Sequence, residues 1–411
     1  NPYQPGLQNI LSSSKMQEEK MTLPGVKWGT PRFTTLVDNG DPDNRLDVAL
    51  IGDGYTVGQQ EMFNEDAQQV VEAFTSIEPM KTYIKHFNFH RINVISEESG
   101  ALDPHVEPPQ KPSTALKTFF SPIADRRLIG PDPWVMLVAT ASGAPWDKIL
   151  CIVNAPRRGG ATLVSMTVGY ASRNSSDFPR IMIHEAGHTI AKVMDEYAGD
   201  LPDIDFAENW SLPSFLPWPN VDTNLKRPKW WRWLTPGVEL PTPDVQVNNE
   251  VVGAFQGAAY TGKGVYRPQR RCLMRRHNHD FCLVCSERWI RAIYKRSQIA
   301  DGFRPKFQLP QPPIRWDEEK PITFQAQVIR TEAIKTVWRT KKLEQVRWRR
   351  RQVTDDYHDF TISLEANRVA GQAIPTAWAV ECILEDGSER IRTPSVRTRS
   401  RHRHRWYVIT M

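Results

Sequence analysis

The chain has 411 residues, of which 40% are hydrophobic and 24% charged, and its formal net charge is +6. This length allows two or three domains, each with a core of its own, and the composition is that of a globular protein. No run approaches the ~20 apolar residues of a membrane-spanning helix, so the sequence predicts no membrane span. Because the chain begins at Asn1 and not at Met, we expect a mature or trimmed product.

The N-terminal half predicts an extended arm followed by an α/β layer. Residues 1–34 are polar and turn-rich and form the predicted arm. Residues 45–56 are typical of a buried strand that ends in a Gly-rich turn, and apolar residues then recur at helical spacing from Gln59 to about Lys85. Further strands are expected over 89–95, 134–139 and 149–153. We therefore expect a mixed sheet packed against an active-site helix.

The strongest functional signal is the pattern His-Glu-x-x-His, formed by His184, Glu185 and His188. On a helix, side chains four residues apart project from one face, so both imidazoles can bind one metal ion with the carboxylate beside it. Asp177 and Pro179 predict where that helix starts. Such a pattern also occurs by chance on solvated helix faces, but here the flanking residues are almost free of charge. We predict a hydrolytic Zn²⁺ site with two histidine ligands and Glu185 as general base.

The segment before this helix, residues 161–171, is placed to form the edge strand along which an extended substrate would pair. After the helix, residues 199–270 form an insertion rich in Pro and Trp. Its aromatic side chains either pack a small core, the interpretation that we favour, or line a substrate cleft.

The composition changes in the C-terminal part. Prolines mark a linker from about residue 304, and short stretches of alternating apolar and polar residues follow. These stretches predict a small immunoglobulin-like β-sandwich over 304–411. Arginines alternate over 397–405, which predicts a strand with one basic, solvated face. No nucleic-acid motif accompanies it, so no nucleic-acid partner is expected. We expect a catalytic domain over 35–303, and a C-terminal domain able to contact a cell surface or a glycan.

These motifs resemble the IgA-peptidase family of zinc endopeptidases over roughly residues 35–300. The motifs that carry the resemblance are, in chain order, Gly52-Asp53-Gly54-Tyr55-Thr56, Phe87-Asn88-Phe89, His184-Glu185-Ala186-Gly187-His188, Asp195-Glu196-Tyr197, Tyr266-Arg267-Pro268, Cys272-Leu273-Met274 and Phe281–Cys285. The resemblance implies a zincin-like domain in a bacterial metallopeptidase that is secreted, periplasmic or at the cell surface. Its substrate would be a protein or peptide, and nothing here implies that this chain cuts immunoglobulin.

The third zinc ligand has several candidates. A continuous helix would place Asp195 about 10 Å beyond His188 along its axis, too far for a bond of ~2 Å, so the helix must end soon after Ala191 if Asp195 binds. Metzincin-like enzymes have Gly three residues after the second His and a ligand at the sixth, but Ala191 and Met194 hold those positions here. We favour Asp195, then Glu196, and otherwise a distant residue with Asp195 orienting a ligating histidine.

Downstream residues are candidates for supporting roles. Met274 resembles the methionine turn beneath the zinc of metzincins, where its role is packing. Tyr266 and Tyr260 are candidates for donating a hydrogen bond to the oxyanion, with Arg267 and His277 behind them.

The five cysteines are Cys151, Cys272, Cys282, Cys285 and Cys382. This odd number leaves at least one thiol unpaired within the chain. For the three that lie close in sequence, Cys272, Cys282 and Cys285, we favour a disulfide that clips the methionine turn to the helix expected next to it. The alternative is a second, structural zinc bound by these cysteines with His277 and His279.

Three functions are compatible with this sequence. The leading prediction is a zinc endopeptidase. The alternatives are a cell-surface protein that binds glycan or protein and keeps a vestigial metal site, and a zinc amidase that acts on cell-wall peptides. The intact Glu185 argues against vestigial chemistry, because a metal site with a purely structural role does not need a general base.

Overall fold

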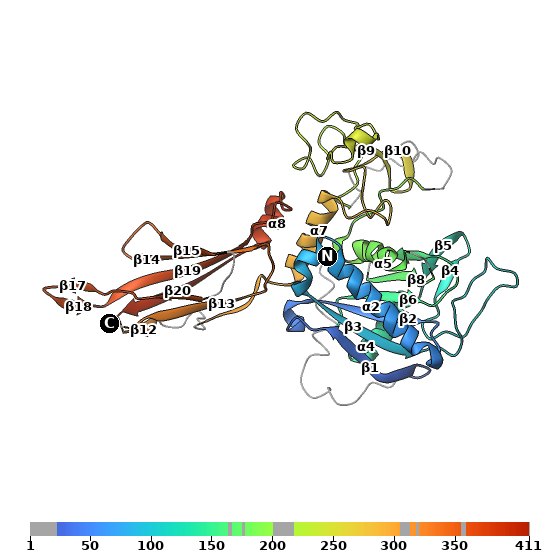
Figure 1. The fold of residues 1–411 in the computed structure, drawn as a ribbon, viewed down its shortest axis with the longest axis horizontal. Helices are drawn as coiled ribbons and strands as arrows, with labels where there is room; N and C mark the ends of the chain where they lie inside the picture. The colour runs from blue at the N-terminus through green and yellow to red at the C-terminus, as the bar shows by residue number, and fades with distance from the viewer. Residues whose placement is uncertain are drawn as a thin grey trace. The chain divides into compact units, whose positions relative to one another are not determined.

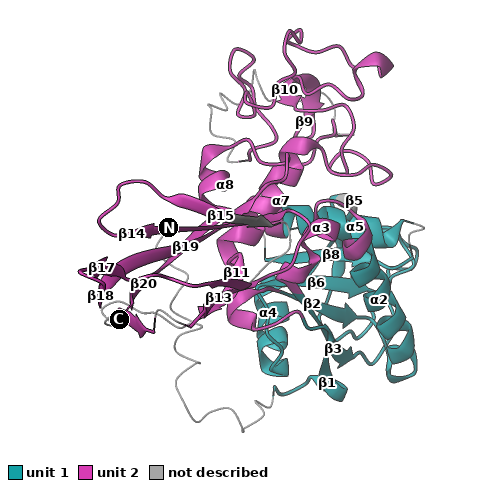
Figure 2. Ribbon diagram, turned by 60° about the vertical axis from the view of Figure 1, so that its left-hand side comes forward, with its two compact units in different colours: residues 1–38, 47–73, 88–189 teal, residues 39–46, 74–87, 190–411 magenta. Residues whose placement is uncertain are grey.

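The computed structural model describes residues 23–162, 167–174, 177–199, 218–304, 313–317, 320–354 and 359–410. The chain divides into two compact units (Figure 2). Unit 1 comprises residues 1–38, 47–73 and 88–189, and unit 2 comprises residues 39–46, 74–87 and 190–411. These units are defined by compactness and do not test the predicted domains over 35–303 and 304–411, which stay a prediction. Within the ranges given above, no helix is both long and apolar enough to cross a membrane.

Unit 1 is built on a six-stranded mixed sheet in the order β1-β3-β2-β6-β8-β7 (Figure 1). These strands are β1 (Lys27–Val37), β3 (Phe87–Ile95), β2 (Leu46–Asp53), β6 (Lys148–Val153), β8 (Val168–Ser172) and β7 (Gly160–Thr162). Strands β2, β6 and β8 are parallel, whereas β1 runs antiparallel to β3 and β7 antiparallel to β8. The predicted mixed sheet is confirmed. Residues 27–34, which we assigned to the arm, belong to β1 instead, because they pair with β3.

One face of this sheet packs against helix α4 (Asp132–Ser142). Val135 and Val138 of the helix share a buried cluster with Ile51 of β2 and Cys151 of β6. Because side chains alternate along a strand, their neighbours in sequence face the other side of the sheet.

The other face carries helices α2 (Gln60–Ser76) and α5 (Phe178–Ala186). At Gly52 of β2, a Cβ atom would lie 2.9 Å from the ring of Phe63 on α2. At Gly169 of β8, it would lie 3.1 Å from Cβ of Glu185 on α5. Strand glycines thus leave room for both helices, and the predicted packing of a sheet against the active-site helix is confirmed.

One predicted element in this region was wrong, and another was too long. Residues 134–139 lie in helix α4 and not in a strand. Proline in its first turn and Gly143, with φ 83°, at its C-cap define the helix, whereas a short apolar run is compatible with either structure. The helix predicted from Gln59 to about Lys85 is confirmed over α2 but ends at Ser76. Pro79 lacks the amide donor that a continuing helix needs, and a short separate helix, α3 (Met80–Tyr83), follows.

Unit 2 contains a hairpin, β9 (Phe255–Ala258) and β10 (Thr261–Arg267), and helix α7 (Leu283–Arg296). In the predicted insertion, the side chains of Trp230 and Trp233 are buried, which agrees with a small core. Part of that insertion, residues 200–217, lies outside the described residues.

The C-terminal region is rich in strands and contains two principal sheets. One has the order β11-β13-β16 and the other β12-β20-β19-β14-β15. Their strands are β11 (Ala300–Arg304), β13 (Ile322–Val328), β16 (Asp359–Ile362), β12 (Ile314–Trp316), β20 (Arg401–Thr410), β19 (Thr376–Asp386), β14 (Ile334–Lys342) and β15 (Arg349–Thr354). Aromatic rings join the sheets, since Phe324 contacts Trp406 and Phe360 stacks on Trp338. The immunoglobulin-like topology stays a prediction.

The basic strand predicted over 397–405 is only partly a strand. Arg397 and Arg399 lie in helix α8 (Pro394–Arg399), which starts because Pro394 suits a first helical turn. The later arginines do lie on β20, where Arg405 pairs with the buried carboxylate of Glu381 at 2.8 Å. The charge of Arg405 is therefore offset within the sheet.

Candidate metal centre

The end of helix α5 is set by an unusual last turn. The helix begins at Phe178, after Asp177 and with Pro179 in its first turn, as predicted. It continues as a π-helical turn over Gly187–Ala191 and is followed by Lys192 in the left-handed conformation, with φ 58°. The predicted end of the helix after Ala191 is confirmed.

This turn accounts for the departure from the metzincin pattern. A π-helical turn takes up one more residue than an α-helical one. The left-handed residue, Lys192, accordingly stands four positions after His188 and not three. The next carboxylate, Asp195, stands seven positions after it and not six. One inserted residue therefore explains both shifts.

Glu185 is buried and held by the neighbouring strand. The hydroxyl of Thr162 on β7 donates a hydrogen bond of 2.8 Å to its Oε2 atom. A Cβ atom at Gly160 would lie 3.0 Å from its Oε1 atom, so a side chain there would crowd the carboxylate. The strand beside the helix thus fixes the orientation of this carboxylate.

The edge strand itself differs from the prediction over 161–171. The last strand in the sheet order is β7 (Gly160–Thr162), and residues 168–172 form the interior strand β8. Residues 163–166 lie outside the described residues.

His184 and His188 lie on one face of the helix, as their spacing predicts. Their ring centroids are 4.9 Å apart. Ligand atoms of these two residues and of Asp195 lie within 4.8 Å of one another. Atoms bonded to one ion at ~2 Å are at most ~4 Å apart, so this group would contract slightly around a metal. Two imidazoles and one carboxylate are the number and kind of protein ligands that a catalytic zinc site uses.

The segment Asp195–Tyr197 is held by the turn of the β9–β10 hairpin. The backbone N–H of Ala259 donates to the carbonyl of Asp195 at 3.0 Å, and that of Tyr260 donates to the carbonyl of Tyr197 at 3.1 Å. Both turn residues have positive φ, of 51° and 68°. For residues other than glycine this conformation costs roughly 1–2 kcal/mol each, so the contacts with Asp195–Tyr197 must offset it.

Of the two tyrosines that we proposed for the oxyanion, Tyr260 has its hydroxyl bonded to Oδ2 of Asp195. Tyr266 lies on β10, and its backbone pairs with that of Asp222 at 2.8 and 3.1 Å. Tyr260 therefore orients a predicted metal ligand, and the catalytic role of Tyr266 stays a prediction.

Sequence reasoning missed Asn220, which is fully buried. Its side chain accepts a hydrogen bond from the N–H of Met194 and donates to the carbonyl of the same residue, each at 2.8 Å. It also donates to Oε1 of Glu196 at 2.9 Å. A single Asn in a long insertion gives no signal in the sequence, because the segment that it holds lies 26 residues away.

Met274 is fully buried, and its carbonyl accepts the N–H of Glu196 at 2.8 Å. This bond joins the predicted methionine turn to the segment that follows helix α5. The packing of Met274 beneath a metal stays a prediction.

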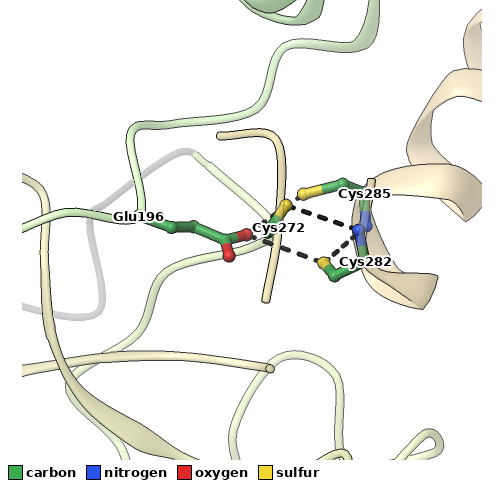
Figure 3. A group of neighbouring side chains, drawn as sticks. All are labelled: Glu196, Cys272, Cys282 and Cys285. Atoms are coloured by element: carbon green, nitrogen blue, oxygen red, sulfur yellow. Dashed lines mark hydrogen bonds between the residues drawn. The ribbon is translucent and has the colours of Figure 1, made fainter. Parts of the chain in front are cut away.

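The predicted disulfide is absent, because all five cysteines carry free thiols. Cys272, Cys282 and Cys285 converge instead on Glu196, and ligand atoms of the four residues lie within 4.8 Å of one another (Figure 3). Neither His277 nor His279 belongs to this group. Cysteine spacing could not reveal it, because the fourth member comes from a remote segment.

Burial and hydrogen bonding act on this cluster in opposite directions. Burial raises the pKa of Glu196, Cys282 and Cys285 well above their usual values. Burial also opposes ionisation of Cys272, but hydrogen bonds from Cys282 and Cys285 outweigh it and lower the pKa of Cys272 well below its usual value.

Comparison with known proteins identifies the family of this chain. A family model described as IgA Peptidase M64 matches residues 34–250 and 244–293. These matches include helix α5, the Asp195–Tyr197 segment, the hairpin and the cysteine cluster. A search of curated proteins gives no match. A peptidase activity is implied by this family. Because the family match covers more than half of the chain, this protein belongs to the IgA peptidase M64 family.

Proposed function

We propose that this protein is a zinc-dependent endopeptidase in which His184, His188 and Asp195 bind zinc. The observation that carries this proposal is the convergence of the three ligand atoms within 4.8 Å. Tyr260 supports it by bonding one carboxylate oxygen of Asp195, which orients the carboxylate towards a metal. This arrangement is that of a zincin-like catalytic domain.

Zinc bound there would polarise the scissile carbonyl and lower the pKa of a bound water towards ~7. Glu185 then accepts the proton of the attacking water and passes it to the departing amine. The hydroxyl of Thr162 donates a hydrogen bond to the Oε2 atom of Glu185, which orients the carboxylate for this proton transfer. Tyr266 is the remaining tyrosine candidate for the oxyanion, since the hydroxyl of Tyr260 is bonded to Asp195.

Strand β7 supplies a means of binding substrate. It is the last strand of its sheet, and Thr162 on it contacts Glu185. An extended peptide that added to this edge would be aligned by main-chain hydrogen bonds. We propose that the substrates are extracellular proteins, that the enzyme works outside the cytoplasm, and that the C-terminal strands form an immunoglobulin-like sandwich.

The test is digestion of casein, an unstructured protein, by wild type and by Glu185→Gln, each with and without 1,10-phenanthroline. Wild type is expected to cleave only without the chelator. The variant is expected to keep its zinc and to lose about 10²–10⁴-fold in rate, the contribution of a general base.

Turnover by zinc-loaded Glu185→Gln at the wild-type rate would rule out the proposed base. No cleavage by zinc-loaded wild type, followed by cleavage of cell-wall peptides, would replace the endopeptidase with an amidase. Inactivity on both, with tight binding of a glycan or protein, would replace it with a binding protein.

A further inference from the structure

A second cluster of metal-binding side chains lies in unit 2, apart from the proposed catalytic residues. The thiol of Cys285 donates to Oε1 of Glu196 at 3.1 Å, and that of Cys282 lies 3.7 Å from the same atom (Figure 3). Cys272 is the third thiol of the group. All four residues are buried, with Cys272, Cys285 and Glu196 fully so.

The cluster has the donors of a closed tetrahedral zinc site. Three sulfur atoms and one carboxylate oxygen give four protein ligands, the number that structural zinc sites use. A disulfide would consume two thiols and leave the third thiol and the carboxylate buried together. Zinc accounts for all four residues.

The carboxylate of Glu196 is only partly satisfied by hydrogen bonds from the protein. Its Oε2 atom is buried and has no hydrogen-bond partner among the described residues. A carboxylate removed from water needs a counter-charge or a full set of hydrogen bonds. A cation bound to Glu196 supplies that counter-charge.

Backbone N–H groups donate hydrogen bonds to two of the sulfur atoms. The N–H of Cys282 donates to Sγ of Cys272, and the N–H of Cys285 donates to Sγ of Cys282, each at 3.4 Å. Cys282 is also the N-cap of helix α7, where the helix dipole favours negative charge. Hydrogen bonds of this kind stabilise thiolates, the form that binds metal.

The surroundings of the cluster also carry positive charge. Three thiolates and one carboxylate would exceed the charge of one Zn²⁺ by two negative charges. The guanidinium of Arg267 is buried, and its charge acts on Glu196. Arg275 and Arg276 flank the methionine turn as well. The excess negative charge is therefore partly offset.

From this geometry we propose that Cys272, Cys282, Cys285 and Glu196 bind a structural Zn²⁺. The ion joins the segment after helix α5, the methionine turn and the start of helix α7. Glu196 directly follows Asp195, so the ion also fixes the backbone beside the proposed third ligand of the catalytic zinc. That positioning role rests on the proposed function, but the thiol site itself does not.

The experiment is zinc analysis by mass spectrometry of the purified full chain, of the double variant His184→Ala/His188→Ala, and of Cys285→Ala. Cys382→Ala is the matched control, because its thiol is also buried and free. Two zinc ions per chain are expected in wild type and in the control. One ion is expected in each of the other two variants.

If Cys285→Ala does not fold, a second measurement tests the thiol site. In the double histidine variant, a mercurial thiol reagent is expected to release the remaining zinc as the clustered thiols react. Replacement of that zinc by Co²⁺ is expected to give thiolate-to-cobalt charge-transfer bands.

The site would be overturned by a folded histidine double variant without zinc, by iron in place of zinc, or by a disulfide among the three cysteines. A histidine double variant that keeps all of the wild-type zinc, of which the thiol reagent releases one ion per chain, would uphold the thiol site and refute the proposed catalytic ligands instead.

Discussion

The two groups of candidate metal ligands in this protein differ in the number and kind of their donor atoms. Among the described residues, His184, His188 and Asp195 offer three donors. Glu196 and three cysteines offer four donors. An open position suits catalysis and a closed set suits structure, because a reacting water needs a free coordination position.

The comparison also shows how adjacent residues serve both groups. Asp195 belongs to one group and Glu196 to the other. Past Lys192 the chain is no longer helical, so consecutive side chains can point in different directions. We infer that the Asp-Glu pair is the covalent link through which a structural ion holds a catalytic ligand.

Brief treatment with 1,10-phenanthroline should separate the two groups most strongly. The ion with three protein ligands should leave first, and all peptidase activity should go with it. One zinc per chain should remain, with little change in the unfolding temperature, because four buried ligands retain it. Zinc content, casein cleavage and thermal unfolding measured on the same samples provide the check. Simultaneous loss of both ions would contradict the distinction.

The isosteric variants Asp195→Asn and Glu196→Gln should each affect a different one of the two zinc ions, although the two residues are adjacent. Asp195→Asn should lose the catalytic zinc and more than the ~100-fold in activity that an outer-shell change costs, while its unfolding temperature stays near that of wild type. Glu196→Gln should lower the unfolding temperature and the affinity for the second zinc. Zinc analysis with calorimetry tests both. The assignment fails if the two variants lose the same ion.

Much of the fold was predictable, because periodicity reports burial. The strands at 45–56, 89–95 and 149–153 were predicted correctly from their apolar residues. The apolar run at 134–139 was not, because a buried helix and a buried strand look alike over six residues. Pro131, Pro133 and Gly143, which mark the ends of that helix, were the better evidence.

The candidate site was predictable only where it is local in sequence. His184, Glu185 and His188 follow from helical spacing alone. Thr162 and Asn220 gave no signal, because each acts through a contact with a segment distant in the sequence. Glu196 was singled out as a candidate ligand beside Asp195, but its contact with the three cysteines was not predicted. The cysteines drew attention by their spacing, yet the chain alone could not show whether a carboxylate or a histidine completes the set.

Tyr260→Phe and Tyr266→Phe should act on different steps. Loss of the Tyr260 hydroxyl frees Asp195 and should weaken catalytic zinc binding by about 10–100-fold, as other outer-shell changes do. Tyr266→Phe should leave zinc binding unchanged and lower kcat, if its hydroxyl donates to the oxyanion. Zinc competition with a chelating dye, measured beside kcat, separates the two. An unchanged kcat in Tyr266→Phe would remove that residue from the mechanism.

Thr162→Val should have the smallest effect, because it changes only the orientation of the general base. The hydroxyl of Thr162 bonds Oε2 of Glu185 at 2.8 Å, and a hydrogen bond to a charged group contributes ~1.5–3 kcal/mol. Since ~1.4 kcal/mol is tenfold in rate, the lower end of this range corresponds to a fall of about tenfold in kcat, with KM and zinc content unchanged. Thr162→Ser keeps the hydroxyl and should restore most of the rate. If Ser were as slow as Val, the methyl group and not the hydrogen bond would be what positions Glu185, and the edge strand would act by packing alone.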